Sequence, residues 1–259
     1  MLDEIVMTKQ QEVEEAKGRL PFEDLKAHLS GYLADRSFRK AIHVPGKLSL
    51  VAALKRKSPS KGMLRERFDP VSLAQGLEKA GAAALSVLTD ETYFGGHLDF
   101  LRDVKQFTEI PVLRKDFIVD PYQVYEAAFY QADAVLLIVR ILTEEQLFQC
   151  MQAADLLGIE PLVEVHAEEE LKTALAAGAH VIGINHRDLR TFTVDPKLSE
   201  QLIPRVPSGK LIVVESGVQT AEDVKRIKRL GAHAVLIGEA LMRASDPAAK
   251  VQELFAGTW

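Results

Sequence analysis

Short apolar runs alternate with longer amphipathic stretches along most of the chain. Eight runs, rich in Val, Ile and Leu, have the length and near-continuous hydrophobicity of parallel strands that are buried on both faces. They span residues 48–54, 83–88, 111–113, 134–139, 161–165, 181–184, 211–214 and 234–237. The pattern therefore predicts eight buried strands separated by helices.

The intervening stretches have recognisable helix starts and stops. Asp69-Pro70, Asp120-Pro121 and Thr143 are typical N-terminal residues, and Gly178 and Gly231 suit helix ends. Eight strand–helix units predict the α/β class and a closed (β/α)8 TIM barrel. An open doubly wound sheet would call for a Gly-rich dinucleotide turn after the first strand, and the chain has a cationic turn there.

Two amphipathic stretches, 2–17 and 21–29, precede the first strand and predict an N-terminal helical extension. No linker or low-complexity segment interrupts the alternation of predicted strands and helices that follows. We therefore expect one domain over 1–259, with the helical extension at 1–46 and the barrel at 47–259.

Composition narrows the classes of function. The chain has 32 Lys and Arg against 37 Asp and Glu, a net charge of −5, so no global basic field favours nucleic acid. Cys150 is the only cysteine, which excludes a disulfide framework or a thiolate metal cluster. The seven histidines show no HExxH spacing, so we expect packing or surface roles for them and no metal.

The N-terminal stretch has no apolar signal core, and no apolar run approaches eighteen residues. These features predict a soluble cytoplasmic protein without a membrane partner. A weak homo-oligomer is left open.

Five ionisable or amide residues lie at strand ends: Lys55, Lys115, Glu164, Asn185 and Glu215. In a (β/α)8 barrel the carboxyl ends of the strands form one mouth, so these residues are predicted to share a pocket. Partly desolvated lysines act as acids or as Schiff-base nucleophiles, although an isolated one more often just binds an anion. Glu164 interrupts an apolar strand and needs a paired cation; paired to a lysine, it is a candidate general base.

Glycines follow the last two strands, in Ser216-Gly217 and Gly238-Glu239. The loops after strands seven and eight of such barrels commonly bind phosphate through backbone N–H groups, although these glycines also suit ordinary turns. Lys57 and Ser58, in the basic turn after the first strand, would face the same phosphate. The alternative for that turn is a solvated basic loop.

Two further features suggest substrate contacts. Arg187 has the planar fork that grips a carboxylate, or it forms a loop contact with Asp188 instead. Tyr93-Phe94, after the second strand, supplies an aromatic wall for a planar ring, or plain packing.

Seven motifs in chain order resemble those of the indole-3-glycerol-phosphate synthase family, a group of tryptophan-pathway barrel enzymes. The motifs are KRKSPS (55–60), SVLTD (86–90), PVLRKDF (111–117), LVEVH (162–166), GINHRDL (183–189), VESGV (214–218) and LIGEALM (236–242). The resemblance runs from the first strand to the last, and the helical N-terminal segment resembles the family's extra helices.

The resemblance implies a substrate, a reaction and no cofactor. The substrate would be 1-(2-carboxyphenylamino)-1-deoxyribulose 5-phosphate, closed to indole-3-glycerol phosphate with loss of carbon dioxide and water. The implied catalytic residues are Lys55, Lys115, Glu164, Asn185 and Ser216. The implied substrate-binding residues are Lys57, Ser58, Phe94, Phe117, Arg187, Glu215, Gly217, Leu236, Gly238 and Glu239.

Two positions depart from the family pattern. Ala53 stands where the family usually has a glutamate that pairs with the first lysine, and His186 replaces a usual asparagine. A positioned carboxylate is worth about 10² to 10⁴ in rate, so we expect impaired activity. The alternatives are an engineered or repurposed barrel with different Lys and Glu chemistry, and a non-catalytic binder of phosphorylated ligands.

Overall fold

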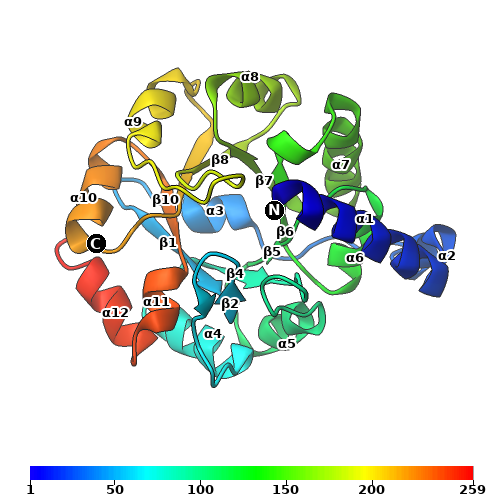
Figure 1. The fold of residues 1–259 in the computed structure, drawn as a ribbon, viewed down its shortest axis with the longest axis horizontal. Coiled ribbons are helices and arrows are strands. Elements are labelled where there is room, and N and C mark those ends of the chain that lie inside the picture. Colours follow the sequence, from blue (N-terminus) through cyan, green and yellow to red (C-terminus); the bar gives the residue numbers. More distant parts are fainter. Residues whose placement is uncertain (259) are drawn as a thin grey trace.

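The computed structural model describes residues 1–258 and contains a closed barrel of eight parallel strands (Figure 1). The strands run in the order β1-β10-β9-β8-β7-β6-β5-β4 around the barrel. They are β1 Ser49–Leu54, β4 Ala84–Leu88, β5 Val112–Lys115, β6 Ala134–Ile138, β7 Glu160–Val165, β8 Val181–Asn185, β9 Leu211–Glu215 and β10 Ala234–Ile237. The predicted (β/α)8 barrel is confirmed.

Helices surround the barrel, and a small hairpin follows β1. The helices are α1 Leu2–Arg19, α2 Phe22–His28, α3 Phe38–Ile42, α4 Pro70–Lys79, α5 Asp99–Phe107, α6 Tyr122–Phe129, α7 Glu144–Leu157, α8 Glu168–Ala176, α9 Leu198–Leu202, α10 Ala221–Arg229, α11 Glu239–Arg243 and α12 Pro247–Leu254. Two 3-10 turns, η1 Val139–Ile141 and η2 Ile203–Arg205, and the hairpin strands β2 Lys57–Ser58 and β3 Gly62–Met63 complete the elements.

Helix boundaries follow local chemistry. The Asp69 side chain accepts from the N–H groups of Val71 and Ser72 at the start of α4. Thr143 and Gln146 form a reciprocal capping box at the start of α7, and Gly158 ends that helix with φ +66°. These caps satisfy backbone groups that a helix end leaves without intrahelical partners.

Side chains alternate between two cores, because successive residues of a strand point to opposite faces. In β1, Leu50 and Ala52 pack in the layer between strands and helices, whereas Val51 and Ala53 pack inside the barrel. Leu162 of β7 also belongs to the interior core. The same two-residue repeat carries Lys55, Glu164 and other inward-facing positions to the mouth above that core.

The N-terminal extension is tied to the barrel by a buried lysine. Lys9 of α1 lies 3.2 Å from Asp90 and 3.0 Å from Asp116, in the segments that follow β4 and β5. A buried charge that loses its partner is strongly destabilising, so this contact holds α1 near the mouth. In Figure 1, α1 runs from near the centre of this face outward to α2, which projects from one side of the barrel. No helix in the described part of the chain combines the length and hydrophobicity needed to cross a membrane.

Candidate functional site

A cavity of about 800 Å³ opens at the carboxyl ends of the strands. It gathers nearly all of the predicted site residues. Those that line it are Ala53, Lys55, Ser58, Phe94, Lys115, Phe117, Glu164, Asn185, Arg187, Glu215, Ser216, Gly217, Leu236, Gly238 and Glu239. Side chains far apart in the sequence therefore converge on a single site.

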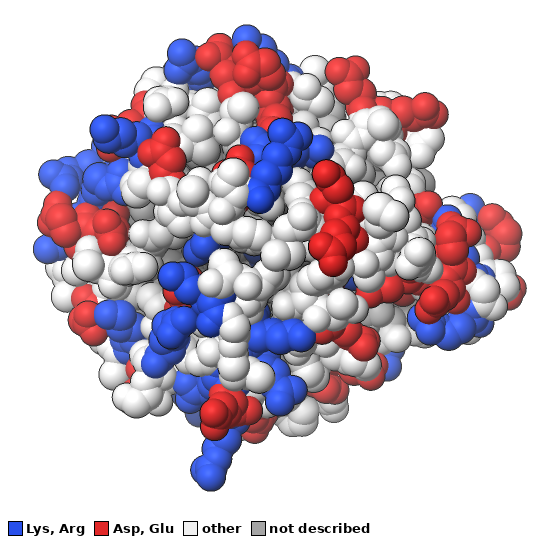
Figure 2. Space-filling view, in the orientation of Figure 1, with Lys and Arg blue, Asp and Glu red and all other residues white. Residues whose placement is uncertain are grey.

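The predicted substrate-binding residue Lys57 is placed elsewhere. Its ammonium group donates to the carbonyl oxygen of Thr92 at 2.9 Å, and Lys57 is not among the residues that line the cavity. Lys61, at the other end of the β2–β3 hairpin turn, lines the cavity along with Arg243 and Lys250. In Figure 2 the basic side chains gather on the part of this face that covers β2 and α11.

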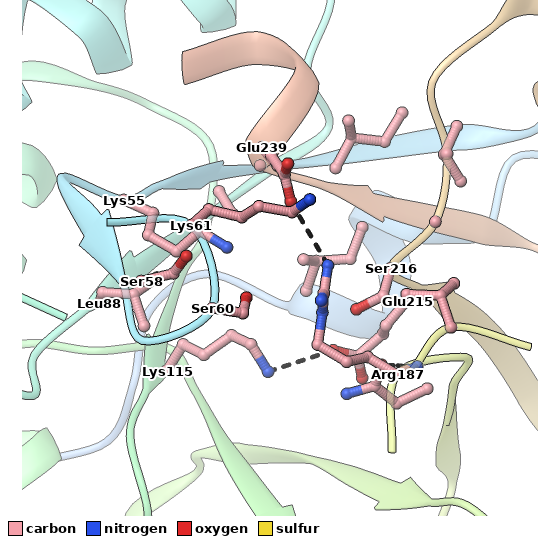
Figure 3. Close-up of a pocket in the computed structure, with 18 of the residues that line it drawn as sticks. Lys55, Ser58, Ser60, Lys61, Leu88, Lys115, Arg187, Glu215, Ser216 and Glu239 are labelled. Carbon is pink, nitrogen blue, oxygen red and sulfur yellow. Dashed lines mark hydrogen bonds and ion pairs between the residues drawn. The ribbon is translucent and has the colours of Figure 1, made fainter. Parts of the chain in front are cut away.

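The centre of the site is a lysine between two buried carboxylates. The Lys115 ammonium lies 3.2 Å from Glu164 Oε2 and 3.2 Å from Glu215 Oε2 (Figure 3). Both glutamates are only 1% exposed. Burial lowers the pKa of Lys115, but the carboxylates of Glu215 and Glu164 outweigh it and raise that pKa above its ordinary value.

The two carboxylates differ in charge environment. Burial raises the pKa of Glu215 to about 7, with Lys115 opposing the rise and Glu164 adding to it. Burial also acts on Glu164, but Lys115 and His166 outweigh it and hold the pKa of Glu164 well below its usual range. Glu164 is thus ionised at neutral pH, while Glu215 is poised to exchange a proton.

Room for Glu215 comes from a glycine on the neighbouring strand. A Cβ placed on Gly183 would lie 2.5 Å from Glu215 Oε1, closer than real Cβ contacts. β8 and β9 run in parallel register with Asn185 opposite Glu215, so Gly183 lies one inward step below that pair. The absence of a side chain at 183 therefore lets Glu215 fold back inside the barrel.

Lys55 has a different environment on the β1 side of the mouth. It forms none of the ion pairs or side-chain hydrogen bonds found in residues 1–258, and burial together with the Arg187 charge lowers its pKa to about 8. Two positions lower on the same face of β1 stands Ala53, and a Cβ on Gly238 would lie 3.0 Å from the Ala53 methyl group. This part of the cavity wall is apolar.

Arg187 is held over the cavity by its neighbours. Its guanidinium lies 3.4 Å from Glu239 Oε2 and donates to the Phe192 carbonyl at 3.3 Å, and its backbone N–H donates to Asn185 Oδ1 at 3.0 Å. Asp188 pairs with Arg140 at 2.7 Å. The alternative of an Arg187 to Asp188 contact therefore has no support in this geometry.

The loops after β9 and β10 also line the cavity. Ser216 and Gly217 both have left-handed backbone, with φ +67° and +77°. A Cβ on Gly217 would lie 2.7 Å from the Val194 side chain, so close packing as well as backbone conformation favours glycine. A non-glycine residue such as Ser216 holds this conformation at a cost that is often found at functional sites.

Two aromatic rings and an aliphatic side chain provide an apolar wall. The rings of Phe94 and Phe117 lie 5.9 Å apart at 38°, and Leu236 also lines the cavity. Asp90 Oδ1 accepts from the N–H groups of Tyr93 and Phe94 and so shapes the loop that carries Phe94. The Tyr93 hydroxyl bonds instead to Thr8 of α1, 2.9 Å away.

Sequence reasoning missed several residues. Lys61, Leu136 and Ile138 line the cavity, and His166 lies beside Glu164 although we expected only packing or surface histidines. One signal was present: His166 is two residues after Glu164 in an inward-facing repeat. Within residues 1–258, no group of three or more His, Cys, Asp or Glu side chains is arranged to hold a metal ion.

A closed parallel barrel with ionisable side chains gathered at the carboxyl ends of its strands defines the class of (β/α)8-barrel enzymes. The family model described as indole-3-glycerol phosphate synthase matches residues 2–254. The chain belongs to the indole-3-glycerol phosphate synthase family.

Similar proteins agree with this placement. The indole-3-glycerol phosphate synthase of Carboxydothermus hydrogenoformans is 44% identical, over 98% of this chain and 99% of the relative. That of Caldanaerobacter subterraneus subsp. tengcongensis is 47% identical, over 95% and 94%. A crystal structure of 3-hexulose-6-phosphate synthase has a TM-score of 0.66 at 20% identity, covering 82% of this chain and 100% of that one, and shows the shared fold alone.

Proposed function

We propose that the protein closes 1-(2-carboxyphenylamino)-1-deoxyribulose 5-phosphate to indole-3-glycerol phosphate, with loss of carbon dioxide and water. As a member of its family it is a carboxy-lyase of tryptophan biosynthesis. The observation that carries the proposal for this site is Lys115, a buried ammonium held between two carboxylates at the mouth of the barrel.

We assign the acid of ring closure to Lys115. In this step a ring carbon attacks the ribulose carbonyl, whose oxygen takes up a proton and becomes a hydroxyl. The raised pKa of Lys115 keeps its proton in place until the substrate oxygen arrives. Loss of carbon dioxide then restores the conjugated ring and needs no further acid.

Dehydration needs an acid for the departing hydroxyl and a base for the remaining proton. We assign these roles to Lys55 and Glu164. A lysine whose pKa is lowered to about 8 is still protonated at neutral pH and donates readily. Once Lys115 has given up its proton, Glu164 loses one of its two cationic neighbours and becomes a stronger base.

The rest of the cavity suits the remaining parts of the substrate. We assign the anthranilate carboxylate to Arg187, the sugar hydroxyls to Asn185 and Glu215, and the aromatic ring to Phe94 and Phe117. The phosphate would lie against the loops after β9 and β10. Those loops contribute Ser216, Gly217, Gly238 and the backbone N–H of Glu239, with Ser58 and Lys61 facing them across the mouth.

Ala53 leads us to propose that activity is impaired. Its methyl group supplies no carboxylate to Lys55, which forms no ion pair among residues 1–258, and the Glu239 charge does not offset the effect of burial on this lysine. A carboxylate positioned for proton transfer contributes about 10² to 10⁴ in rate. We expect turnover to be weak for this reason and to recover when a carboxylate is supplied at this position.

The test is a fluorescence assay for the indole product with the parent chain, Ala53→Glu and Ala53→Gln. We expect weak turnover in the parent, a rise of at least about tenfold in Ala53→Glu, and no comparable rise in Ala53→Gln, which has the size without the charge. Equal and high activity in all three would refute the role of position 53. Absence of turnover in all three would refute the reaction.

The unpaired state of Lys55 favours a second candidate, a repurposed site in which this amine forms a Schiff base with a carbonyl substrate. The amine would add to the carbonyl and release water, leaving an imine. Borohydride with a phosphorylated ketose would then fix a covalent adduct on Lys55. If turnover proceeds and no adduct forms, Lys55 only transfers protons.

A further inference from the structure

His166 occupies a buried position that the assigned steps leave without a role. It follows β7 directly, two residues after Glu164 in the inward-facing repeat, and its side chain is 2% exposed. Its Nε2 lies 3.1 Å from Glu164 Oε1, and its Nδ1 lies 3.4 Å from Glu170 Oε2. A histidine between two carboxylates is favoured in its doubly protonated, cationic form.

The contacts continue away from the cavity as a chain of alternating charge. Glu170, in the first turn of α8, pairs with Arg140 of η1 at 2.7 Å, and Arg140 pairs with Asp188 at 2.7 Å. Asp188 Oδ1 then accepts from the N–H groups of Arg190 and Thr191. Glu170 is thus anchored from its far side, so its distance to His166 is set by the frame of the barrel.

The groups around His166 come from several elements. Glu164 of β7 and Glu170 of α8 contact it, Arg140 of η1 lies behind Glu170, and Lys115 of β5 and Glu215 of β9 lie beyond Glu164. Burial lowers the pKa of His166, but the two contacting carboxylates outweigh burial and raise that pKa to about 9. Glu164 thus has the Lys115 ammonium at Oε2 and the His166 ring at Oε1, whereas Glu215 has the Lys115 ammonium at Oε2.

We propose that His166 is a positioning residue, an imidazolium that binds one oxygen of Glu164 and keeps this carboxylate ionised with its other oxygen on Lys115. The inference rests on the proposed roles of Lys115 and Glu164. With His166 charged, the proton of the Lys115–Glu164 pair stays on the lysine, from which it passes to the substrate. Without that charge, Glu164 competes for protons as the pH falls.

The functional test compares the parent with His166→Gln across pH 5 to 9. Glutamine keeps an N–H donor and removes the charge. Removing a cation raises the pKa of the neighbouring carboxylate, so the acid limb of kcat should move to higher pH. At neutral pH we expect kcat to fall roughly tenfold, an effect of the size expected for the loss of one interaction between contacting residues. The change in KM should be smaller. The matched control is His180→Gln, an exposed histidine just before β8, which should leave both parameters unchanged.

The charge itself is measured in the parent without any assay of turnover. Nitrogen-15 NMR of labelled histidine, with His166 assigned as the signal missing from His166→Gln, should show both ring nitrogens protonated at pH 7.5. Titration should show this imidazolium losing its proton near pH 9. A neutral tautomer of His166 at pH 7.5 would overturn the proposal, as would an unmoved acid limb in folded His166→Gln.

The two failures can be told apart. A protein with a charged His166 and no turnover of the ribulose ester would refute the proposed function alone. A protein that turns over the ester with a neutral His166 would refute the positioning role alone. If His166→Gln does not fold, the NMR state of His166 in the parent, assigned against Glu164→Gln, decides the question.

Discussion

The two sides of the barrel mouth shift the pKa of a lysine in opposite directions. On the side of β5, β7 and β9, Lys115 contacts two carboxylates, which outweigh the effect of burial and raise its pKa. On the side of β1 and β10, Lys55 stands above Ala53 and beside Gly238 without such a partner, and its pKa is lowered to about 8. A lysine therefore retains its proton on the paired side and releases it more easily on the unpaired side.

The largest effect is expected from breaking the paired side. Lys115→Met removes the acid of ring closure and should lower kcat by about 10² to 10⁴. It also leaves Glu164 and Glu215 together without their shared cation, so one of them should take up a proton near neutral pH. Steady-state assays measure the fall in kcat. The pH dependence of the thermal midpoint measures the proton uptake by the carboxylates.

The control for this change is Lys172→Met, in which an exposed lysine of α8 is replaced by the same residue. It should retain parental kinetics. A Lys115→Met protein that is folded and within a few-fold of parental kcat would remove Lys115 from the proposed chemistry.

A smaller effect on the same side should follow from Gly183→Ala. The new Cβ would lie 2.5 Å from Glu215 Oε1 and force that carboxylate to shift, which changes its contact with Lys115. Displacement of a catalytic group by about 1 Å costs up to 10² in rate, so we expect kcat to fall between tenfold and a hundredfold. Kinetics and a crystal structure of the variant measure the shift.

Gly76→Ala is the matched control for that substitution. Gly76 lies within α4, and a Cβ there has nothing within 4 Å. This change should leave kcat unaltered and raise the free energy of unfolding by about 0.5–1 kcal/mol through helix propensity. Full activity in Gly183→Ala would show that Glu215 tolerates displacement.

The smallest effect concerns the unpaired side and is a shift in pH dependence. If Lys55 acts as an acid, activity should decline as pH rises through about 8, where this lysine loses its proton. An added carboxylate raises the pKa of a neighbouring ammonium, so Ala53→Glu should move the alkaline limb to higher pH. Ala53→Gln should leave the limb in place, and an equal shift in both variants would assign it to a different group.

Most of the barrel could be predicted because its signal is local. Each predicted strand overlaps an observed one, with ends that differ by at most two residues, since a buried parallel strand is a continuous apolar run. The rule that strand ends meet at one mouth also predicted that Lys115, Glu164 and Glu215 would share a pocket, but not that Lys115 would pair with both carboxylates. Distances and charge states did not follow, because they depend on neighbours from other strands.

The misses have physical reasons. Lys57 belongs to the basic turn, but the hairpin directs its ammonium to the Thr92 carbonyl, and no local pattern reports that geometry. His166 looked like one of seven unremarkable histidines because its partner Glu170 lies on the following helix. Lys9 was part of an amphipathic helix, and its burial against Asp90 and Asp116 depends on long-range packing.

The two-residue alternation along the strands has a consequence for how such a chain can change in length. In β7 the chemistry of Glu164 and the helix packing of Val163 occupy adjacent positions that face opposite ways. Deleting one residue within the strand would exchange them, placing a carboxylate among the helices and a valine at the mouth. We therefore expect insertions and deletions to be tolerated only in the loops, where a change in length does not reverse the faces of the strand residues.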